Sequence, residues 1–263
     1  TIRALAQLTT PYILMTGANG FLERIEFIGL ETETYFEENG FGSDSTRAAV
    51  KVTGDDCSIE HFKVSKVAHG IWLDSAKRPK ISHAHMEGLN TLAVIPGSPH
   101  KVGESVGWHQ HTFIKSTGTS FGACLTQLSA RNVGNVINIG GSLSVLGARI
   151  SDIYGENIHD HVVYFTGIGH AVTNISANKT TSSVVQARGW DHTIVNVITN
   201  GSPTVISIQG QAGFERGTYV GGNILVVNAT GSNLSSISTN VANAFDVWDG
   251  YGDTRNVKFV GCT

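Results

Sequence analysis

The sequence has few charged residues, few prolines and few cysteines for its length. Of its 263 residues, 15% are charged, five are proline and three are cysteine, and the formal net charge is −3. Such a charge balance gives no electrostatic reason to bind nucleic acid or an anionic membrane surface. We therefore expect no nucleic-acid partner.

Long apolar runs are also absent. No run approaches the roughly 20 residues that a helix needs to cross a bilayer, and no signal-peptide pattern opens the chain. We therefore expect no insertion into a membrane.

The three cysteines, Cys57, Cys124 and Cys262, are odd in number and widely spaced. They predict neither a disulfide framework nor a zinc site, and favour small buried hydrophobic side chains.

Residues typical of strands and turns are abundant instead. Val, Ile, Thr, Ser and Asn dominate together with 31 glycines, whereas helix formers are scarce. This balance is typical of many short strands joined by tight turns. The composition therefore predicts an all-β protein.

The chain repeats itself with a period of 22 residues. Ile153, Ile175 and Val197 end three similar hexapeptides and are each 22 residues apart. A second short apolar run follows each hexapeptide, at residues 161–165, 183–187 and 204–208. A period in the low twenties with two or three β-branched strands per unit predicts a solenoid. One unit has too little apolar surface to form a core alone, so neighbouring units must stack.

The same period extends over much of the chain. Ile59 and Ile81 are again 22 residues apart, and Ile224 precedes Val257 by 33. We expect one domain over residues 1–263, with irregular insertions near residues 31–47, 96–106, 209–221 and 228–254. A repeat-like strand at residues 256–260 lies close to the last residue without the polar cap that terminal repeats need. This predicts that the chain is part of a longer protein.

The three repeated units resemble a known architecture. Asn174 and Asn196 each precede the apolar residue that ends a hexapeptide. The pattern resembles the single-stranded right-handed parallel β-helix of the pectate-lyase-like superfamily, and within it the tailspike depolymerases of bacteriophages. The resemblance implies an extracellular protein of the virion tail, a homotrimer with its helices side by side, that acts on a bacterial capsule or O-antigen. No catalytic motif of one particular family is present, and the fold alone does not fix the function.

Strand alternation predicts which residues of the second runs face outward. The residues expected to face the core are 163 and 165 in the first run, 185 and 187 in the second, and 206 and 208 in the third. The residues between them, 164, 186 and 207, should then point outward, as should Val162, Val184 and Val205. Aligned outward side chains on strands about 4.8 Å apart can hydrogen-bond an extended sugar chain, although an ordinary solvated face has the same pattern. The predicted substrate-binding residues are Trp72, Asp74, His161, Tyr164, Gln186, Arg188, Trp190, Gln209 and Arg216.

Carboxylates lie in the turns beside this strip. Hydrolysis of a glycosidic bond needs a protonated acid and a second carboxylate roughly 5 to 9.5 Å away. We expect Glu156 or Asp160 to pair with Asp191, with Glu215 as a reserve, in a hydrolase of a bacterial surface polysaccharide. For each acid, the alternative is a carboxylate that caps a turn.

Two other functions fit the same scaffold. A lyase that acts on a uronic-acid polymer needs a base for the proton beside the carboxylate and a cation that neutralises that carboxylate. His161 or Tyr164 could be the base and Arg188 the cation. The other alternative is a non-catalytic β-helix that binds carbohydrate or has a structural role.

Metal and nucleotide sites are not expected. Three His-x-His pairs begin at His83, His109 and His159, but no third ligand accompanies any of them. The glycine-rich segments at residues 18–20 and 134–141 lack a P-loop or a dinucleotide-binding pattern. The sequence thus predicts no cofactor.

Overall fold

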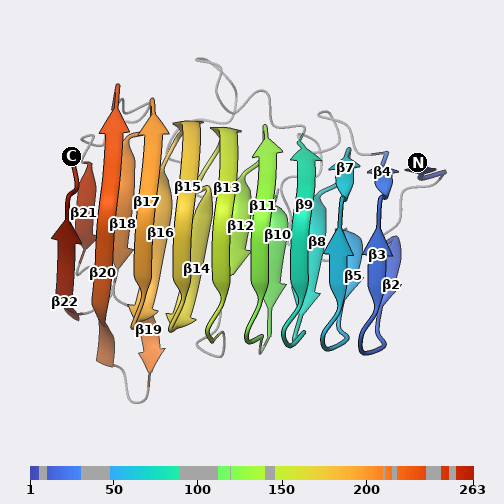
Figure 1. The fold of residues 1–263 in the computed structure, drawn as a ribbon, viewed down its shortest axis with the longest axis horizontal. Coiled ribbons are helices and arrows are strands. Elements are labelled where there is room, and N and C mark those ends of the chain that lie inside the picture. The colour runs from blue at the N-terminus through green and yellow to red at the C-terminus, as the bar shows by residue number, and fades with distance from the viewer. Residues whose placement is uncertain are drawn as a thin grey trace.

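The computed structural model describes residues 1–5, 11–30, 48–88, 112–118, 120–139, 146–209, 211–214, 218–234, 244–248 and 253–263. These residues form 22 strands, and none of the described segments is a helix that could span a membrane. The strands stack in two rows along one long axis, with the two termini at opposite ends (Figure 1). The protein is a right-handed parallel β-helix, as the sequence predicted.

The front row contains the strands nearest the viewer in Figure 1. These are β3 (Phe21–Glu23), β4 (Glu26–Ile28), β6 (Ser58–Glu60), β7 (Lys63–Ser65), β9 (Lys80–Glu87), β11 (Cys124–Arg131), β13 (Arg149–Ile158), β15 (Ala171–Thr180), β17 (Thr193–Asn200), β20 (Thr218–Ser232) and β22 (Asp253–Val260). The short strand β1 (Ile2–Arg3) pairs with β4.

The back row lies behind them. Its strands are β2 (Ile13–Met15), β5 (Ala48–Val52), β8 (His69–Asp74), β10 (Thr112–Thr117), β12 (Asn135–Ile139), β14 (Val163–Ile168), β16 (Ser183–Trp190), β18 (Thr204–Gln209) and β21 (Phe245–Trp248). Each strand pairs in parallel with the strand of the next coil in the same row.

The 22-residue period is the register of the coils. Ile153 lies beside Ile175, and Ile175 lies beside Val197. Ile59 pairs with Ile81 in the same way, and Ile224 pairs with Val257 across the longer spacing. Equivalent apolar residues therefore stack on one another, and each coil completes the core of its neighbours.

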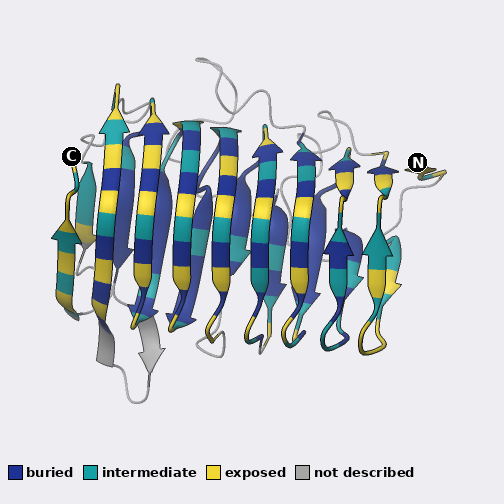
Figure 2. Ribbon diagram, in the orientation of Figure 1, coloured by how far each residue is buried: buried dark blue, intermediate teal, exposed yellow. Residues whose placement is uncertain are grey.

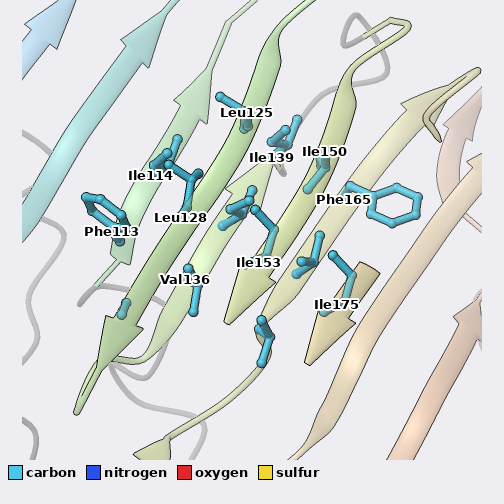
Figure 3. Close-up of a cluster of buried hydrophobic side chains, with 14 of the residues drawn as sticks. Phe113, Ile114, Leu125, Leu128, Val136, Ile139, Ile150, Ile153, Phe165 and Ile175 are labelled. Atoms are coloured by element: carbon cyan, nitrogen blue, oxygen red, sulfur yellow. The ribbon is translucent and has the colours of Figure 1, made fainter. Parts of the chain in front are cut away.

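The core lies between the two rows. Figure 3 shows apolar side chains from both rows, including Phe113, Leu128, Ile153 and Phe165, gathered in this space. All four are fully buried. The predicted inward positions of the second runs belong to this core, as the alternation of a strand requires.

Three residues predicted to point outward are instead fully buried. Val162 lies directly before β14, and Val184 and Val205 are the second residues of β16 and β18. A side-chain carbon added to Gly155 would come within 2.7 Å of a methyl carbon of Val162, so Val162 faces the interior of its coil. The chain turns a corner at these positions, and the alternation of the following strand does not extend back through a corner.

A second corner divides each front strand. Its residue has a positive φ, 56° at both Asn174 and Asn196, a region that asparagine tolerates better than most residues. The side-chain nitrogen of Asn196 donates a hydrogen bond of 3.1 Å to the side-chain oxygen of Asn174. The side-chain nitrogen of Asn174 in turn donates one of 2.9 Å to Asp152. Asn174 and Asn196 are exposed, and Figure 2 shows exposed bands at matching heights in neighbouring front strands.

The predicted insertions have different outcomes. Those near residues 31–47 and 96–106 lie outside the described residues. The segment near residues 209–221 contains β19 (Gln211–Phe214), which pairs antiparallel with the start of β20. The insertion near residues 228–254 is shorter than expected, because β20 continues through Ser232 and β21 pairs with β18.

Candidate functional site

The outward side chains of the back row form a ladder with one residue per coil. Consecutive rungs pair in register, which places them about 4.8 Å apart along the axis. We call this set the back ladder; its rungs are Lys51, Trp72, Lys115, Asn138, Tyr164, Gln186, Ser207 and Asp246. Asp74, Thr117, Arg188 and Gln209 lie two residues further along their strands.

The back ladder is more sheltered than a solvated face would be. Gln186 and Ser207 are each 6% exposed and Gln209 is 7% exposed, while Tyr164 and Arg188 are half-buried. Polar groups removed from water need hydrogen-bond partners within the protein. The interactions between these side chains therefore fix where each polar group points.

Arg188 is held between two neighbouring coils. Its Nε and Nη2 atoms donate hydrogen bonds of 3.0 and 2.6 Å to Oε1 of Gln209. The guanidinium carbon lies 5.3 Å from the ring centroid of Tyr164, one coil away on the other side. The positive charge is thus placed over the aromatic face, where it interacts favourably with the ring.

His161 is fixed at the corner before β14. Its Nε2 lies 3.0 Å from Oδ1 of Asp160, and its Nδ1 lies 2.9 Å from Oγ of Ser183. The imidazole stacks on Tyr164 with a centroid separation of 5.9 Å and an angle of 19° between the planes. His161 is only 5% exposed, so it supports the tyrosine ring from the protein side.

Trp72 and Asp74 belong to a separate cluster at the other end of the ladder. Lys51 Nζ lies 2.8 Å from Oδ2 of Asp74 and 3.7 Å from the ring centroid of Trp72. The indole nitrogen of Trp72 donates a 2.7 Å hydrogen bond to Thr117. Trp72 is 9% exposed and Lys51 covers its ring, so this indole is not placed as an open platform for a sugar.

Lys115 stands between the two clusters. It is half-buried, and its neighbours on the ladder are Trp72 and Asn138. Burial lowers the pKa of its ammonium group. The sequence-based reasoning missed Lys115, because residues 112–117 have no 22-residue echo from which to assign their alternation. The only signal was a lysine within an apolar run.

The predicted pair of Asp160 and Asp191 is not assembled. Asp160 precedes β14, whereas Asp191 follows β16 and is exposed. The eight residues of β16 span about 25 Å, so the two corners lie well beyond the roughly 5 to 9.5 Å of a glycosidase pair. Asp191 accepts a 3.0 Å hydrogen bond from the side chain of Asn223, as expected of a carboxylate in a turn.

Glu156 lies on the front row. It pairs in register with Arg131, which binds Glu87 through hydrogen bonds of 2.9 and 2.8 Å. These hydrogen bonds raise the pKa of Arg131. Glu156 therefore joins a charged row on a different sheet face from Tyr164.

The other predicted site residues are divided between positions. Trp190 ends β16 and is half-buried beside Gly222 of the longer coil, whereas Glu215 and Arg216 lie outside the described residues.

Among the described residues, no three His, Cys, Asp or Glu side chains form a metal site. His83 stacks on His61 at 4.7 Å, and His85 hydrogen-bonds Ser129.

Two buried histidines anchor the corner that follows the back strands. The backbone N–H groups of Ala148 and His170 donate to Nδ1 of His170 and His192, at 3.1 and 3.2 Å. Each Nε2 then carries the proton and donates to the carbonyl of Thr166 or Arg188, at 2.9 and 3.0 Å. Burial lowers the pKa of His170 to about 4 and that of His192 to about 3. The backbone of Arg188 is thereby fixed by a neutral imidazole.

Comparison with known proteins shows the fold. No protein-family profile and no curated protein sequence matches this chain. An endo-xylogalacturonan hydrolase from Aspergillus tubingensis has a similar structure, with a TM-score of 0.59 and 12% identity over 96% of this chain and 72% of that one. At this identity the likeness concerns architecture alone. It supports the right-handed parallel β-helix fold that the sequence predicted.

Two further solved structures are more distant. An alginate lyase from Paenibacillus has a TM-score of 0.41 and 12% identity, over 94% of this chain and 93% of that one. An exopolygalacturonase from Thermotoga maritima also has a TM-score of 0.41, with 10% identity over 96% of this chain and 72% of that one.

Proposed function

We propose that this protein cleaves an acidic polysaccharide by β-elimination on the back ladder, with Tyr164 and Arg188 at the reacting sugar. The observation that carries the proposal is that Tyr164, Arg188 and His161 are brought together on adjacent coils. The described residues hold no carboxylate pair of glycosidase spacing on the back row, where Asp74 and Asp246 lie about six coils, roughly 29 Å, apart.

Tyr164 is better placed than His161 to act as the base. Both nitrogens of His161 are engaged by Asp160 and Ser183, and the ring is almost fully buried. Tyr164 is half-buried, so part of it is open to a ligand. His161 is then a positioning residue that holds the phenol ring, and Arg188 stabilises negative charge beside it.

The reaction follows from these positions. The phenolate oxygen of Tyr164 removes the proton from the carbon beside the sugar carboxylate, and Arg188 neutralises the charge that develops on that carboxylate. The electron pair of the broken C–H bond forms a double bond to the neighbouring carbon, whose bond to the glycosidic oxygen breaks. The leaving oxygen takes the proton back from the phenol. No water enters the product.

A polysaccharide substrate is also consistent with the fold. The structure with a TM-score of 0.59 is named for activity on xylogalacturonan, and its architecture matches this chain over most of its length. A parallel β-helix offers an extended face with regular spacing, which suits a polymer. Architecture supports the substrate class, and the side chains of the back ladder support the reaction.

Hydrolysis of a capsule or O-antigen is the second candidate. Asp160 favours it, because this carboxylate lies at the corner beside His161 and Tyr164. Its partner would have to come from outside the described residues, where Glu215 lies, or from another chain. The tailspike role, the homotrimer and the extracellular or virion-tail location stay predictions from the sequence.

A product analysis separates the candidates. The protein would be incubated with bacterial capsules, O-antigens and polyuronates, and products followed by mass spectrometry and ultraviolet absorbance. We expect products that absorb through a new double bond and have not gained water. Tyr164→Phe should lower the rate by about 10²-fold or more. Tyr154→Phe, on the exposed front row, should leave the rate unchanged.

Other results would overturn the proposal. Products heavier by one water, lost in Asp160→Asn, would identify a hydrolase. Binding of a polymer without shortening would identify a non-catalytic carbohydrate-binding protein. Full activity of Tyr164→Phe would remove this residue from the chemistry.

A further inference from the structure

Two lysines occupy the back ladder, and they differ in one respect. Lys51 has a carboxylate 2.8 Å away on Asp74 and the ring of Trp72 at 3.7 Å. Lys115 is half-buried two coils further along, and among the described residues no carboxylate forms an ion pair with it. The same face thus holds one ammonium group with a counter-charge and one to which no described residue supplies a counter-charge.

An ammonium group removed from water without a counter-charge lowers the stability of a protein. Burial is the cause of the lowered pKa of Lys115, and no carboxylate of the described residues offsets it. A methionine or leucine at this position would avoid that cost. A charge kept in such a place points to a role in binding.

The position of Lys115 relates it to the candidate site. The register runs from Lys115 through Asn138 to Tyr164, which places Lys115 two coils, or about 10 Å along the axis, from the reacting group. Asn138 lies between them and is half-buried, so its amide can hydrogen-bond a neutral part of a ligand. Charge, amide and phenol follow one another along a single line.

We propose that Lys115 is an anion subsite that binds a carboxylate of the polymer two coils away from the sugar that reacts at Tyr164. The proposal rests on the proposed function and specifies its substrate. The ligand is an acidic glycan that lies along the helix axis over β10, β12 and β14. Its carboxylate provides the counter-charge that Asp74 supplies to Lys51 and that no described residue supplies to Lys115.

The neighbouring groups favour a carboxylate over a neutral sugar at this point. The indole nitrogen of Trp72 already donates its hydrogen bond to Thr117. Of the two neighbouring side chains, Lys115 therefore supplies the donor for a ligand, through its ammonium group. In a partly desolvated site, attraction between opposite charges is stronger than in water. Lysine is a compact charge with three donors, which suits carboxylates in several orientations.

The test compares acidic polymers with uncharged versions of the same polymers. Polygalacturonate, alginate and hyaluronate would be run in affinity gels beside forms whose carboxyl groups have been reduced to alcohols. We expect the wild-type protein to be retarded by at least one acidic polymer and by none of the reduced forms. Lys115→Met should weaken that binding at least tenfold. Lys63→Met, which removes an exposed lysine of the front row, should bind as the wild type does.

Thermal unfolding shows whether the variant folds and adds a second criterion. Because Lys115→Met removes a desolvated charge without a counter-charge, its midpoint should equal or exceed that of the wild type. A lysine with only a structural role would give the opposite shift. A folded Lys115→Met protein that binds acidic polymer like the wild type would overturn the subsite, as would a wild-type protein that binds none of the acidic polymers.

The subsite and the proposed reaction can fail separately. If the wild type releases unsaturated products and Lys115→Met keeps full affinity, the subsite is wrong and the reaction stands. If Lys115→Met loses affinity while the wild type releases no product, the subsite stands and the protein binds acidic glycans without cleaving them.

Discussion

Single residues at the corners help the strands to fix the candidate site. The carbonyl of Arg188 accepts a hydrogen bond from His192, and the ring of Tyr164 is supported by His161. Both histidines are buried next to backbone or hydroxyl groups. The functional side chains are therefore positioned by residues that do not face a ligand.

The buried histidines predict that stability depends on pH. In the unfolded chain, His170 and His192 bind protons near pH 6.5, whereas the folded protein keeps them neutral down to about pH 4 and about pH 3. The stability that they contribute is complete above pH 6.5 and is lost as the pH falls through that window. Each should remove about 1.4 kcal/mol per pH unit between pH 6 and pH 4.5.

Urea unfolding at several pH values measures this slope. His192→Asn keeps an acceptor for the N–H of His170 and removes one titrating group, so it should reduce the slope by roughly half. His83→Asn, at an exposed position of the front row, serves as the control. An unchanged slope in His192→Asn would show that other groups cause the acid sensitivity.

Alternation within a strand was the most informative sequence signal at this scale. It placed Tyr164, Gln186 and Arg188 on one face; Tyr164 and Gln186 are paired in the register, and Arg188 lies two residues further along β16. It failed at Val162, where the chain turns a corner. Sequence distance also gave no indication of which corner an acid occupies, so Asp191 was predicted next to Asp160 although a whole strand separates them.

At the scale of the element, the corner asparagines hold each front strand in its bent form. Asn196 has a φ of 56°, donates to Asn174 and accepts a 3.3 Å hydrogen bond from Asn228. Asn196→Ala should lower the free energy of unfolding by about 1 to 2 kcal/mol, because alanine is strained at positive φ and lacks both hydrogen bonds.

A glycine at the same place separates the two causes. Asn196→Gly keeps the backbone conformation accessible and loses only the hydrogen bonds, so it should be less destabilising than Asn196→Ala. Both variants would be compared with the wild type by chemical denaturation. If Asn196→Gly lowered the free energy of unfolding as much as Asn196→Ala, backbone strain would not contribute to the destabilisation by alanine.

Elements with the 22-residue echo could be predicted from the sequence, whereas of the longer coils only the step from Ile224 to Val257 was found. The step from Ile194 to Val226 is 32 residues, because β19 and the start of β20 extend that coil. A change of period hides the strand that follows it. This is why β21 was predicted as part of an insertion although it pairs with β18.

At the scale of the whole molecule, each coil contacts only its neighbours, so stability is expected to vary along the axis. The first coil exposes Leu14 and Phe21 by 58% and 60%, whereas Ile150, Val172 and Ile194 in the central coils are fully buried. Amide hydrogen exchange should be slowest in β13 to β17 and fastest in β1 to β4. Mass spectrometry of peptic fragments measures this gradient. Uniform protection would indicate that all coils unfold together.

The constant rise of the coils makes the back row a ruler. Tyr164 and Lys115 are two coils apart on it, and a small change of the backbone cannot make that distance two and a half coils. A polymer whose acidic groups have a different repeat must then be matched by moving the charge to another rung. The selectivity of the ladder for glycans would accordingly change in whole steps of about 4.8 Å, one coil at a time.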